Sequence, residues 1–139
     1  MLECLIIGDS IAVGLAAHRP ECASLSKGGI NTWQWNQRYK SQDLTADSVI
    51  ISLGSNDHKH VKTQHELIKI RQQVNARQVY WILPHGNLKA SGVEIKKIQA
   101  IVKQIAAEYG DIVVPITRVQ KDNIHPSTAG YKQLSEKTQ

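Results

Sequence analysis

The sequence predicts an α/β fold in which helices cover both faces of a parallel β-sheet. Five short apolar runs rich in β-branched residues have the length and composition of buried strands. Segments with helical character lie between them, so strand and helix alternate along the whole chain. Strict alternation implies βαβ units with right-handed crossovers, and such units build a parallel sheet with helices on either side.

The expected strands lie, in chain order, at Leu2–Ile7, about Ala23–Ser26, Ser48–Leu53, Gln78–Leu83 and Ile112–Pro115. Open parallel sheets bind ligands beyond the carboxyl ends of their strands. Functional residues are therefore expected in the loops that follow the strands, which read GDS, KGGINT, GSND, PHGNLKASG and TRVQKDNIHP.

The expected helices lie at Ile11–His18, about Thr32–Tyr39, Lys62–Asn75, Ser91–Tyr109 and Pro126–Glu136. The first is a run of small residues that follows the end of the first strand at Gly8. The fourth has an apolar stripe at helical spacing, ended by Gly110 and formed by Val93, Ile95, Ile98, Ile101, Val102 and Ile105. In the fifth, Pro126 suits the first position of a helix.

The composition predicts one domain that spans residues 1–139. The chain has 139 residues, of which 41% are hydrophobic and 21% charged, enough for one globular unit with a moderate core. No apolar run approaches the roughly 20 residues that span a bilayer, and no cationic and apolar leader precedes the first strand. We therefore expect no membrane span and a cytoplasmic location.

The net charge of +5 raises the question of nucleic-acid binding. The basic residues are dispersed among acidic residues and glutamines, which is typical of a solvated surface and not of a nucleic-acid footprint. The two cysteines, Cys4 and Cys22, show no metal-ligand spacing, and we expect both to be reduced residues in or beside the core.

Ser10 stands where the first strand breaks and a helix begins. Unpaired backbone N–H groups at a helix N-terminus favour negative charge at that point. Ser and Asp are also preferred capping residues, so a purely structural role for Ser10 or Asp9 as helix cap is the simpler explanation of this stretch alone.

Two later loops offer groups that complement an exposed serine. Asp122 and His125 are three residues apart, so in a turn the carboxylate can accept a hydrogen bond from the imidazole, as for a general base oriented by an acid. Asn56 follows the third strand, and its amide can donate to an oxyanion, as can a glycine N–H in KGGINT and the N–H of Ser10.

These residues give the chain a resemblance to the SGNH, or GDSL-type, hydrolases. The blocks Gly8-Asp9-Ser10, Gly28-Gly29, Gly54-Ser55-Asn56-Asp57 and Asp122-Asn123-Ile124-His125 occur in the order of that family's motifs and span nearly the whole chain. The resemblance implies a three-layer α/β/α flavodoxin-like fold with a five-stranded parallel sheet. It also implies ester or thioester hydrolysis by a triad of Ser10, His125 and Asp122.

The resemblance further implies an oxyanion hole formed by Ser10, Gly29 and Asn56. Gly29 is preferred because it directly precedes the short polar turn, and Gly28 stays an alternative. Ile11 follows the serine where the family often has leucine, which is a small change at an apolar position.

The function we expect is hydrolysis of short-chain acyl esters, with acylated carbohydrate among the candidate substrates. The alternatives are an acyl-thioesterase or lysophospholipase-like activity and, from another class, a non-catalytic flavodoxin-like binding module. The expected partner is a small-molecule acyl ester, with no nucleic acid and no cofactor, and the sequence leaves the oligomeric state open.

Trp33 and His85 are candidates for lining the substrate site, because Trp33 lies close to Gly29 and His85 follows the fourth strand. Trp33, Trp35 and Trp81 are all expected to pack in the core or against a helix, and only Trp33 is close enough to Gly29 to border the site as well. The neighbouring His58, His60 and His65 are expected to be surface residues and not metal ligands.

Overall fold

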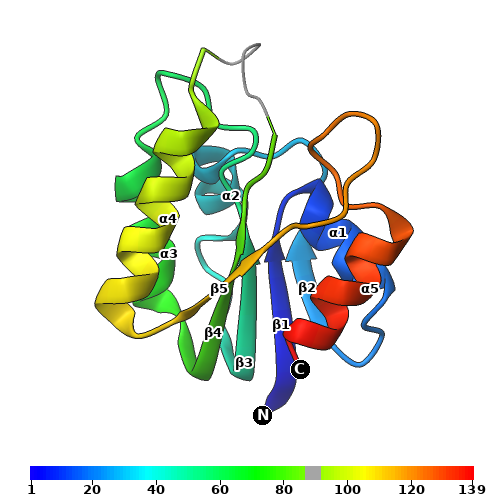
Figure 1. The fold of residues 1–139 in the computed structure, drawn as a ribbon. Coiled ribbons are helices and arrows are strands. Elements are labelled where there is room, and N and C mark those ends of the chain that lie inside the picture. Colours follow the sequence, from blue (N-terminus) through cyan, green and yellow to red (C-terminus); the bar gives the residue numbers. More distant parts are fainter. Residues whose placement is uncertain (87–91) are drawn as a thin grey trace.

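The computed structural model describes residues 1–86 and 92–139, and its five strands form a single parallel sheet in those residues. The strand order is β2-β1-β3-β4-β5 (Figure 1). The strands are β1 (Leu2–Gly8), β2 (Ala23–Ser26), β3 (Thr45–Ser52), β4 (Asn75–Leu83) and β5 (Ile112–Pro115). The strand order reverses direction at β1, so the ends of β1 and β3 mark the place where such sheets bind ligands.

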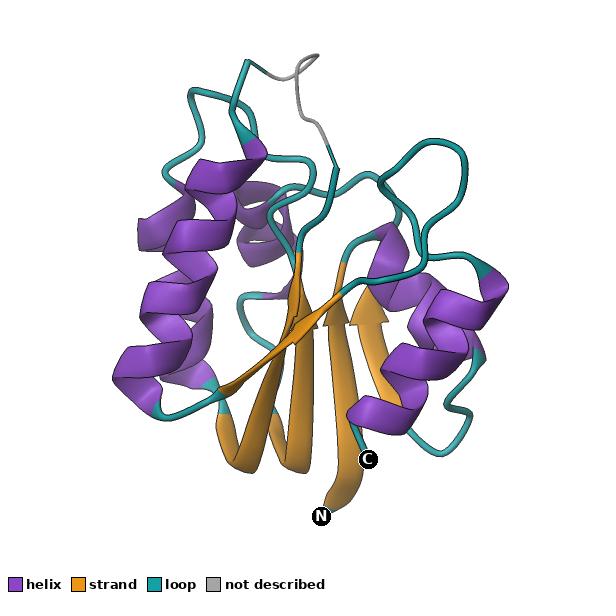
Figure 2. Ribbon diagram, viewed as in Figure 1, coloured by secondary structure: helices purple, strands orange, loops and turns teal. Residues whose placement is uncertain are grey.

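The helices form layers on both faces of the sheet, as Figures 1 and 2 show. Helices α1 (Ser10–Ala17) and α5 (Thr128–Lys137) cover one face. The other face carries α2 (Thr32–Tyr39), α3 (Thr63–Gln73) and α4 (Ile95–Tyr109). The predicted three-layer α/β/α fold with a five-stranded parallel sheet is therefore confirmed.

The core is divided by the sheet, because successive strand residues point to opposite faces. Leu5 and Ile7 of β1 pack on the α2–α4 side, whereas Ile6 packs on the α1–α5 side. Trp35 and Trp81 are almost fully buried in the first of these clusters, as the core interpretation of tryptophan predicts. Trp33, by contrast, leaves 52% of its surface exposed.

Several predicted helix boundaries differ from the structure; the first helix is shifted by one residue, to Ser10–Ala17, and larger differences occur in the third, fourth and fifth helices. The third helix ends at Gln73 instead of Asn75, because Val74 is extended and the N–H of Asn75 donates to the carbonyl of Leu44 at the start of β4. The fourth helix begins at Ile95; its predicted first residue, Ser91, lies outside the described residues.

The fifth helix begins at Thr128, and Pro126 is not its first residue. Ser127 is the N-cap, with its hydroxyl accepting a hydrogen bond from the N–H of Gly130 at 3.1 Å. Pro126 instead forms an isolated antiparallel bridge with Val119. This bridge closes the base of the loop that carries Asp122 and His125.

Cys4 and Cys22 form a disulfide, so the prediction that both are reduced is wrong. The parallel register places Leu5 opposite Ala23, which brings the two preceding cysteines together. A separation of 18 residues does not reveal such a contact before the strand pairing is known. Disulfides form and persist in oxidising compartments, so this bond weighs against the expected cytoplasmic location.

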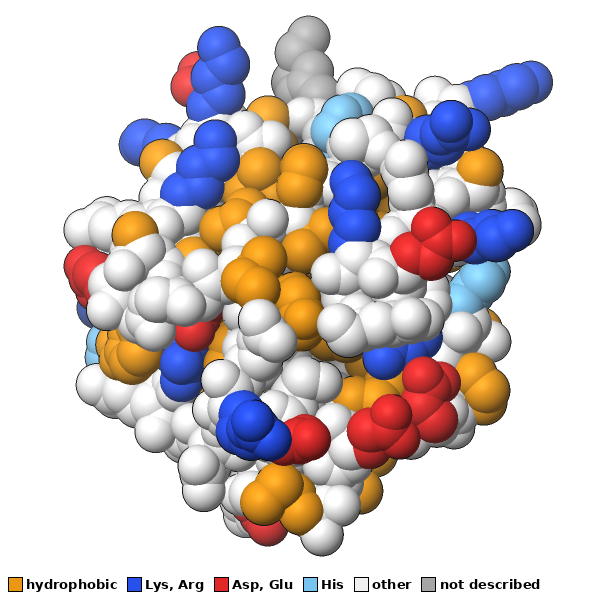
Figure 3. All heavy atoms as spheres, turned by 60° about the horizontal axis from the view of Figure 1, so that its bottom comes forward, with side chains coloured by type: hydrophobic (Ala, Val, Ile, Leu, Met, Phe, Trp, Pro, Cys, Tyr) orange, Lys and Arg blue, Asp and Glu red, His pale blue; other side chains and the backbone are white. Residues whose placement is uncertain are grey.

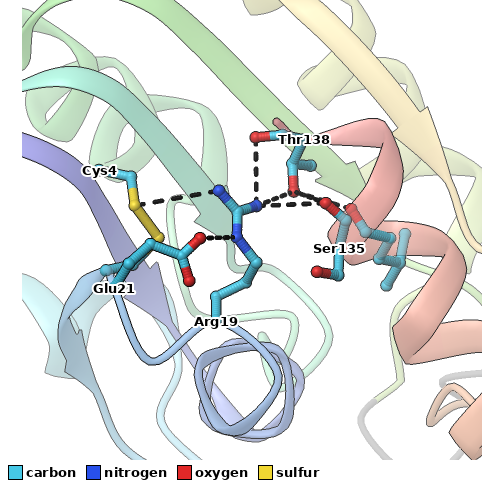
Figure 4. Close-up of a disulfide and its surroundings, with 7 residues drawn as sticks. Cys4, Arg19, Glu21, Ser135 and Thr138 are labelled. Carbon is cyan, nitrogen blue, oxygen red and sulfur yellow. Dashed lines mark hydrogen bonds and ion pairs between the residues drawn. A yellow bond between two sulfur atoms is a disulfide. The ribbon is translucent and has the colours of Figure 1, made fainter.

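Arg19 lies beside the disulfide and joins the end of α1 to the end of α5 (Figure 4). It is 5% exposed and donates to a carboxylate oxygen of Glu21 at 2.8 Å. Its guanidinium also donates to the backbone carbonyls of Ser135 and Thr138, each at 3.3 Å, and to the hydroxyl of Thr138 at 2.9 Å. The last turn of α5 thus has its carbonyl groups satisfied by a buried cation.

None of the helices described by the structure is both long enough and apolar enough to cross a bilayer. On the face shown in Figure 3, Lys and Arg side chains are scattered among acidic and neutral ones and form no continuous basic patch. This distribution agrees with the solvated surface that the dispersed charges of the sequence predict.

Candidate functional site

Ser10 is the first residue of α1 and follows directly on the end of β1. Asp9 is the N-cap, and its Oδ1 accepts the N–H of Ile11 at 3.0 Å. Gly8 has φ +146°, and a Cβ there would collide with the carbonyl of Ser52. The structure thus gives the capping role to Asp9, which leaves the half-buried hydroxyl of Ser10 available for another partner.

That partner is the imidazole of His125. The Oγ of Ser10 lies 2.8 Å from Nε2 of His125, across 115 residues of sequence. The contact joins the carboxyl end of β1 to the loop between β5 and α5. It places a hydroxyl and a ring nitrogen at the separation that proton transfer between them requires.

Asp122 holds the other side of the same imidazole. Its Oδ2 lies 2.6 Å from Nδ1 of His125, and its Oδ1 accepts the backbone N–H groups of Ile124 and His125 at 2.9 and 3.0 Å. These hydrogen bonds, first that from Ile124 and then those from His125, lower the pKa of Asp122 to about 2. Asp122 is therefore ionised at neutral pH and accepts the Nδ1 proton, which leaves Nε2 facing Ser10.

The turn between these two residues needs a left-handed residue, which Asn123 supplies with φ +61°. Asn is among the residues that adopt this conformation most readily. The carbonyl of Asn123 accepts a hydrogen bond from Nδ1 of His85 at 2.9 Å. His85, proposed from the sequence as a lining residue, therefore braces the loop of Asp122 and His125.

The loop after β3 brings Asn56 and Asp57 to the same edge of the sheet. The side-chain amide of Asn56 donates to the carbonyl of Ile30 at 3.1 Å. Asp57 is buried and accepts hydrogen bonds from the N–H and hydroxyl of Thr32, at 2.9 and 2.7 Å, and from the hydroxyl of Thr63 at 2.6 Å. Asp57 thus fastens the starts of α2 and α3 to the loop that carries Asn56.

Gly28 and Gly29 both lie at this edge, after β2. A Cβ built on Gly28 would lie 3.9 Å from the Cβ of Ser10, whereas one on Gly29 would meet no atom within 4 Å. Gly29 has φ +77°, which favours glycine. In the part of the chain that the structure describes, neither amide donates a hydrogen bond. The structure thus leaves both glycine amides as candidate donors.

Asp9 is fully buried next to the serine. Desolvation raises its pKa from 3.8 to about 7, against the opposing effect of hydrogen bonds from Ile11 and the hydroxyl of Ser52. Its Oδ2 has no hydrogen-bond partner among the described residues. Its hydrogen bonds go to the first turn of α1 and to the last residue of β3, so this carboxyl group caps the helix and supports the loop.

The exposed histidines His58, His60 and His65 do not bring their ring nitrogens together as a metal site in the described residues. The rings of His58 and His60 are edge to face with centroids 5.9 Å apart, and Nδ1 of His58 accepts the backbone N–H of His60. The grouped candidate ligands of the described chain are Cys4, Glu21 and Cys22, and both of those sulfurs belong to the disulfide.

Two features of this site escaped sequence reasoning. The contact of His85 with Asn123 joins residues 38 positions apart, and no local spacing announces it. The hydrogen bond from Asn56 to Ile30 uses the backbone carbonyl of Ile30, so the residue type at position 30 does not indicate it. The Asn31-x-x-Gln34 pattern in the sequence is a signal for the capping box that forms at the start of α2.

The solved structures that resemble this chain include a GDSL-like lipase, a lipase/acylhydrolase and the catalytic domain of an O-acetyltransferase. A GDSL-like lipase from Bacteroides thetaiotaomicron has 16% identity and a TM-score of 0.72, with 99% of this chain and 89% of that chain covered. A lipase/acylhydrolase from Enterococcus faecalis has 20% identity and a TM-score of 0.70, with coverage of 96% and 92%.

The catalytic domain of peptidoglycan O-acetyltransferase A from Streptococcus pneumoniae has 15% identity and a TM-score of 0.67, with coverage of 96% and 88%. A search of curated proteins finds no significant match. At these identities the structural likeness establishes the fold.

Residues 6–133 match the sequence model of the GDSL-like Lipase/Acylhydrolase family. The match includes each of the four motif blocks, from Gly8 to His125. The chain belongs to this family of acyl hydrolases, and the resemblance drawn from the sequence motifs is confirmed.

Proposed function

We propose that this chain is a serine esterase that hydrolyses short-chain acyl esters. The observation that carries the proposal is a chain of two hydrogen bonds through the imidazole of His125. One joins Nε2 to the Oγ of Ser10 at 2.8 Å, and the other joins Nδ1 to Oδ2 of Asp122 at 2.6 Å. Membership of an acylhydrolase family supports the same reaction class. A serine, a histidine and an aspartate in this geometry form the triad of nucleophilic acyl transfer.

In the proposed reaction, the Oγ of Ser10 attacks the acyl carbon while Nε2 of His125 takes the hydroxyl proton. The resulting imidazolium is stabilised by Asp122 and then gives its proton to the leaving alcohol oxygen. The acyl group is left on Ser10. Water attacks this acyl-enzyme with His125 again as the base, which releases the carboxylic acid and restores the serine hydroxyl.

The negative charge that develops on the carbonyl oxygen needs donors at the same edge. The first-turn N–H of Ser10, an amide of the Gly28-Gly29 pair and the side chain of Asn56 are the proposed donors. One proton of the Asn56 amide is held by the carbonyl of Ile30, so the amide is oriented with its second proton free for the substrate. The N-terminal end of α1 adds a favourable electrostatic field for the same charge.

The test compares the wild-type protein with Ser10→Ala in p-nitrophenyl acetate hydrolysis and fluorophosphonate labelling. The variant should lose both, since alanine has no nucleophilic oxygen, and should keep the wild-type circular dichroism spectrum. Ser24→Ala, at an exposed serine of β2, is the matched control and should keep both. Retained hydrolysis in Ser10→Ala, or a label on another residue, contradicts the proposal.

An acyl-CoA series in the same assay separates esterase from thioesterase activity, because the triad chemistry serves either leaving group. We expect the ester to be preferred at equal acyl length. Activity should persist after EDTA dialysis, since the proposed nucleophile and base are side chains. Loss on dialysis with recovery on adding zinc would contradict the proposed mechanism.

A further inference from the structure

A hollow of about 530 Å³ lies beside the glycine loop next to Ser10. It is lined at its inner end by Gly28 and Gly29, and a Cβ on Gly28 would lie 3.9 Å from that of Ser10. Its outer wall is formed by α2 and the end of β2, through Lys27, Trp33, Gln34, Gln37 and Arg38. The volume lies within the range of small-molecule sites, and Gly28 of its lining lies next to the proposed nucleophile.

The lining combines one aromatic surface with polar and cationic groups. Trp33 is 52% exposed, and Trp35 and Trp81 are buried. Gln37 presents an amide that can donate and accept hydrogen bonds, and Gln34 presents amide N–H donors, because its Oε1 accepts the N–H of Asn31 at 3.0 Å. An alkyl chain would leave these groups unpaired, whereas a sugar ring has apolar faces for the indole and hydroxyl groups for the amides.

The charge of the lining is positive. Lys27 and Arg38 contribute cations, and no carboxylate is among the described residues of this hollow. The guanidinium of Arg38 is partly anchored, because its Nε donates to the hydroxyl of Tyr39 at 3.2 Å. A fixed guanidinium is well suited to a carboxylate, which it can bind with two parallel hydrogen bonds.

Trp33 also borders a second hollow of about 570 Å³, on its other side. That hollow is lined by Lys62 and by the exposed His58, His60 and His65. Its one carboxylate, Glu66, is 8% exposed and accepts a hydrogen bond from Asn36 at 2.8 Å. A ligand longer than one ring could therefore extend past Trp33 and reach Lys62.

We propose that this surface, defined by Lys27, Trp33, Gln34, Gln37 and Arg38, binds the alcohol portion of the substrate, and that this portion is an anionic saccharide. The inference rests on the esterase function proposed above. The acyl carbon lies at Ser10, the sugar ring lies on Trp33, and carboxylates of the saccharide pair with Lys27 and Arg38.

The first experiment measures kcat/KM on O-acetylated oligogalacturonate, O-acetylated xylo-oligosaccharide and p-nitrophenyl acetate. The anionic substrate should exceed the neutral one at least tenfold, and its KM should rise with NaCl because the charges are at the surface. The proposal is overturned if the protein hydrolyses p-nitrophenyl acetate but its kcat/KM on the neutral saccharide equals or exceeds that on the anionic one. That result leaves the esterase function standing.

The second experiment locates the site with variants. The pair Lys27→Gln and Arg38→Gln should remove the preference for the anionic saccharide. Trp33→Ala should raise the KM for both saccharides by a factor at least ten times greater than its effect on the KM for p-nitrophenyl acetate. Trp33→Phe, which keeps an aromatic ring, should raise the saccharide KM less than Trp33→Ala does. Arg77→Gln is the control and should behave as wild type, because Arg77 is exposed and lies near the amino end of β4, away from the carboxyl ends of the strands.

Binding can be measured apart from turnover with unacetylated oligogalacturonate and tryptophan fluorescence. Trp33 is the exposed member of the three tryptophans, so saturable quenching should occur in wild type and in Ser10→Ala and should be absent in Trp33→Ala. Quenching in a wild-type protein that hydrolyses none of the ester substrates would refute the proposed function and retain the saccharide site. Quenching that persists in Trp33→Ala would refute the site.

Discussion

The side-chain amide of Asn56 donates a hydrogen bond to the backbone carbonyl of Ile30 at 3.1 Å. This contact joins the loop after β3 to the loop after β2, where Gly28 and Gly29 lie. It uses one of the two amide protons and fixes the direction of the other. A donor held in this way needs no reorganisation when charge develops on a substrate oxygen, which is the property that makes such groups effective in catalysis.

Replacing Asn56 by alanine should lower kcat for p-nitrophenyl acetate by roughly 10²–10³ and leave KM nearly unchanged, because one oxyanion donor is lost in the transition state. Initial rates over a range of substrate concentrations measure both constants. Asn75→Ala, at an exposed residue at the start of β4, is the matched control. A wild-type kcat in Asn56→Ala would remove this residue from the oxyanion hole.

Replacing Asp122 by asparagine tests the orientation of His125. An asparagine offers one oxygen, and the two backbone N–H groups of Ile124 and His125 already compete for it. The amide then faces Nδ1, which favours the tautomer that points a proton at Ser10. We expect kcat to fall on the order of 10⁴ with little change in Tm. A loss below tenfold would show that Asp122 does not set the tautomer.

Much of this arrangement follows from the sequence. Alternation of apolar strands and helices predicts the parallel sheet, and the carboxyl ends of parallel strands meet at one edge, so Ser10, Asn56 and His125 were expected there. The helix ends were harder to predict, because the N–H of Asn75 pairs with Leu44 and the hydroxyl of Ser127 caps α5 in place of Pro126. Contacts with distant backbone decide these ends.

The disulfide and the contact of His85 with Asn123 lie beyond sequence reasoning for the same reason. Each depends on the register of strands or on the approach of two loops. Gly86 shows this for the loops, because a Cβ there would collide with the carbonyl of Asn123. The sequence contains the glycine, but its requirement appears only when the two loops are placed side by side.

The buried Asp9 should make stability depend on pH. Its pKa is about 7 in the folded protein and near 3.8 in the unfolded chain, so the native state holds the proton over this interval. The contribution of Asp9 to the free energy of unfolding is complete below about pH 3.8 and is lost as the pH rises through about 7. The free energy of unfolding falls by no more than about 1.4 kcal/mol per pH unit over this interval. Urea unfolding at several pH values measures the slope.

In Asp9→Asn this contribution to the slope should vanish, and the N-cap should be kept because asparagine is a good capping residue. Asp47→Asn, at an exposed aspartate, should keep the wild-type slope. If the free energy of unfolding of wild type and Asp9→Asn changes with pH in parallel between pH 4 and 7, Asp9 does not hold a proton in the folded state.

Reduction of the disulfide should destabilise the protein without abolishing the fold. The bond closes a loop of 18 residues, for which chain entropy gives about 3 kcal/mol, and at this chain length that lowers Tm by roughly 10 °C. Thermal melts with and without dithiothreitol measure the shift. The double variant Cys4→Ala and Cys22→Ala should have a Tm close to that of the reduced wild type, both with and without dithiothreitol. An unchanged Tm after complete reduction, checked by thiol counting, contradicts this stabilisation.

The last prediction concerns acyl length and depends on how little apolar wall the described residues, 1–86 and 92–139, give the site. Five apolar side chains in or beside the loops after the strands could cover an acyl chain: Ile30, Trp33, Val61, Leu88 and Ile124. Ile30 is 5% exposed and belongs to the core, and Leu88 lies outside the described residues. Val61 is half-buried and lies between His58 and Lys62 in the second hollow, and Trp33 is assigned above to the alcohol portion. Ile124 is the remaining half-buried side chain near His125.

Each methylene of an acyl chain stabilises binding by about 0.8 kcal/mol where a wall covers it, and otherwise stays in water. We therefore expect kcat/KM for p-nitrophenyl acetate, butyrate, octanoate and palmitate to peak at two to four carbons and then to fall. The series is measured from initial rates, after subtraction of the spontaneous hydrolysis rate and of the residual rate of the Ser10→Ala variant. A maximum at eight carbons or more would mean that an apolar groove covers the acyl chain, and the preferred substrates would then be long-chain lipids or thioesters.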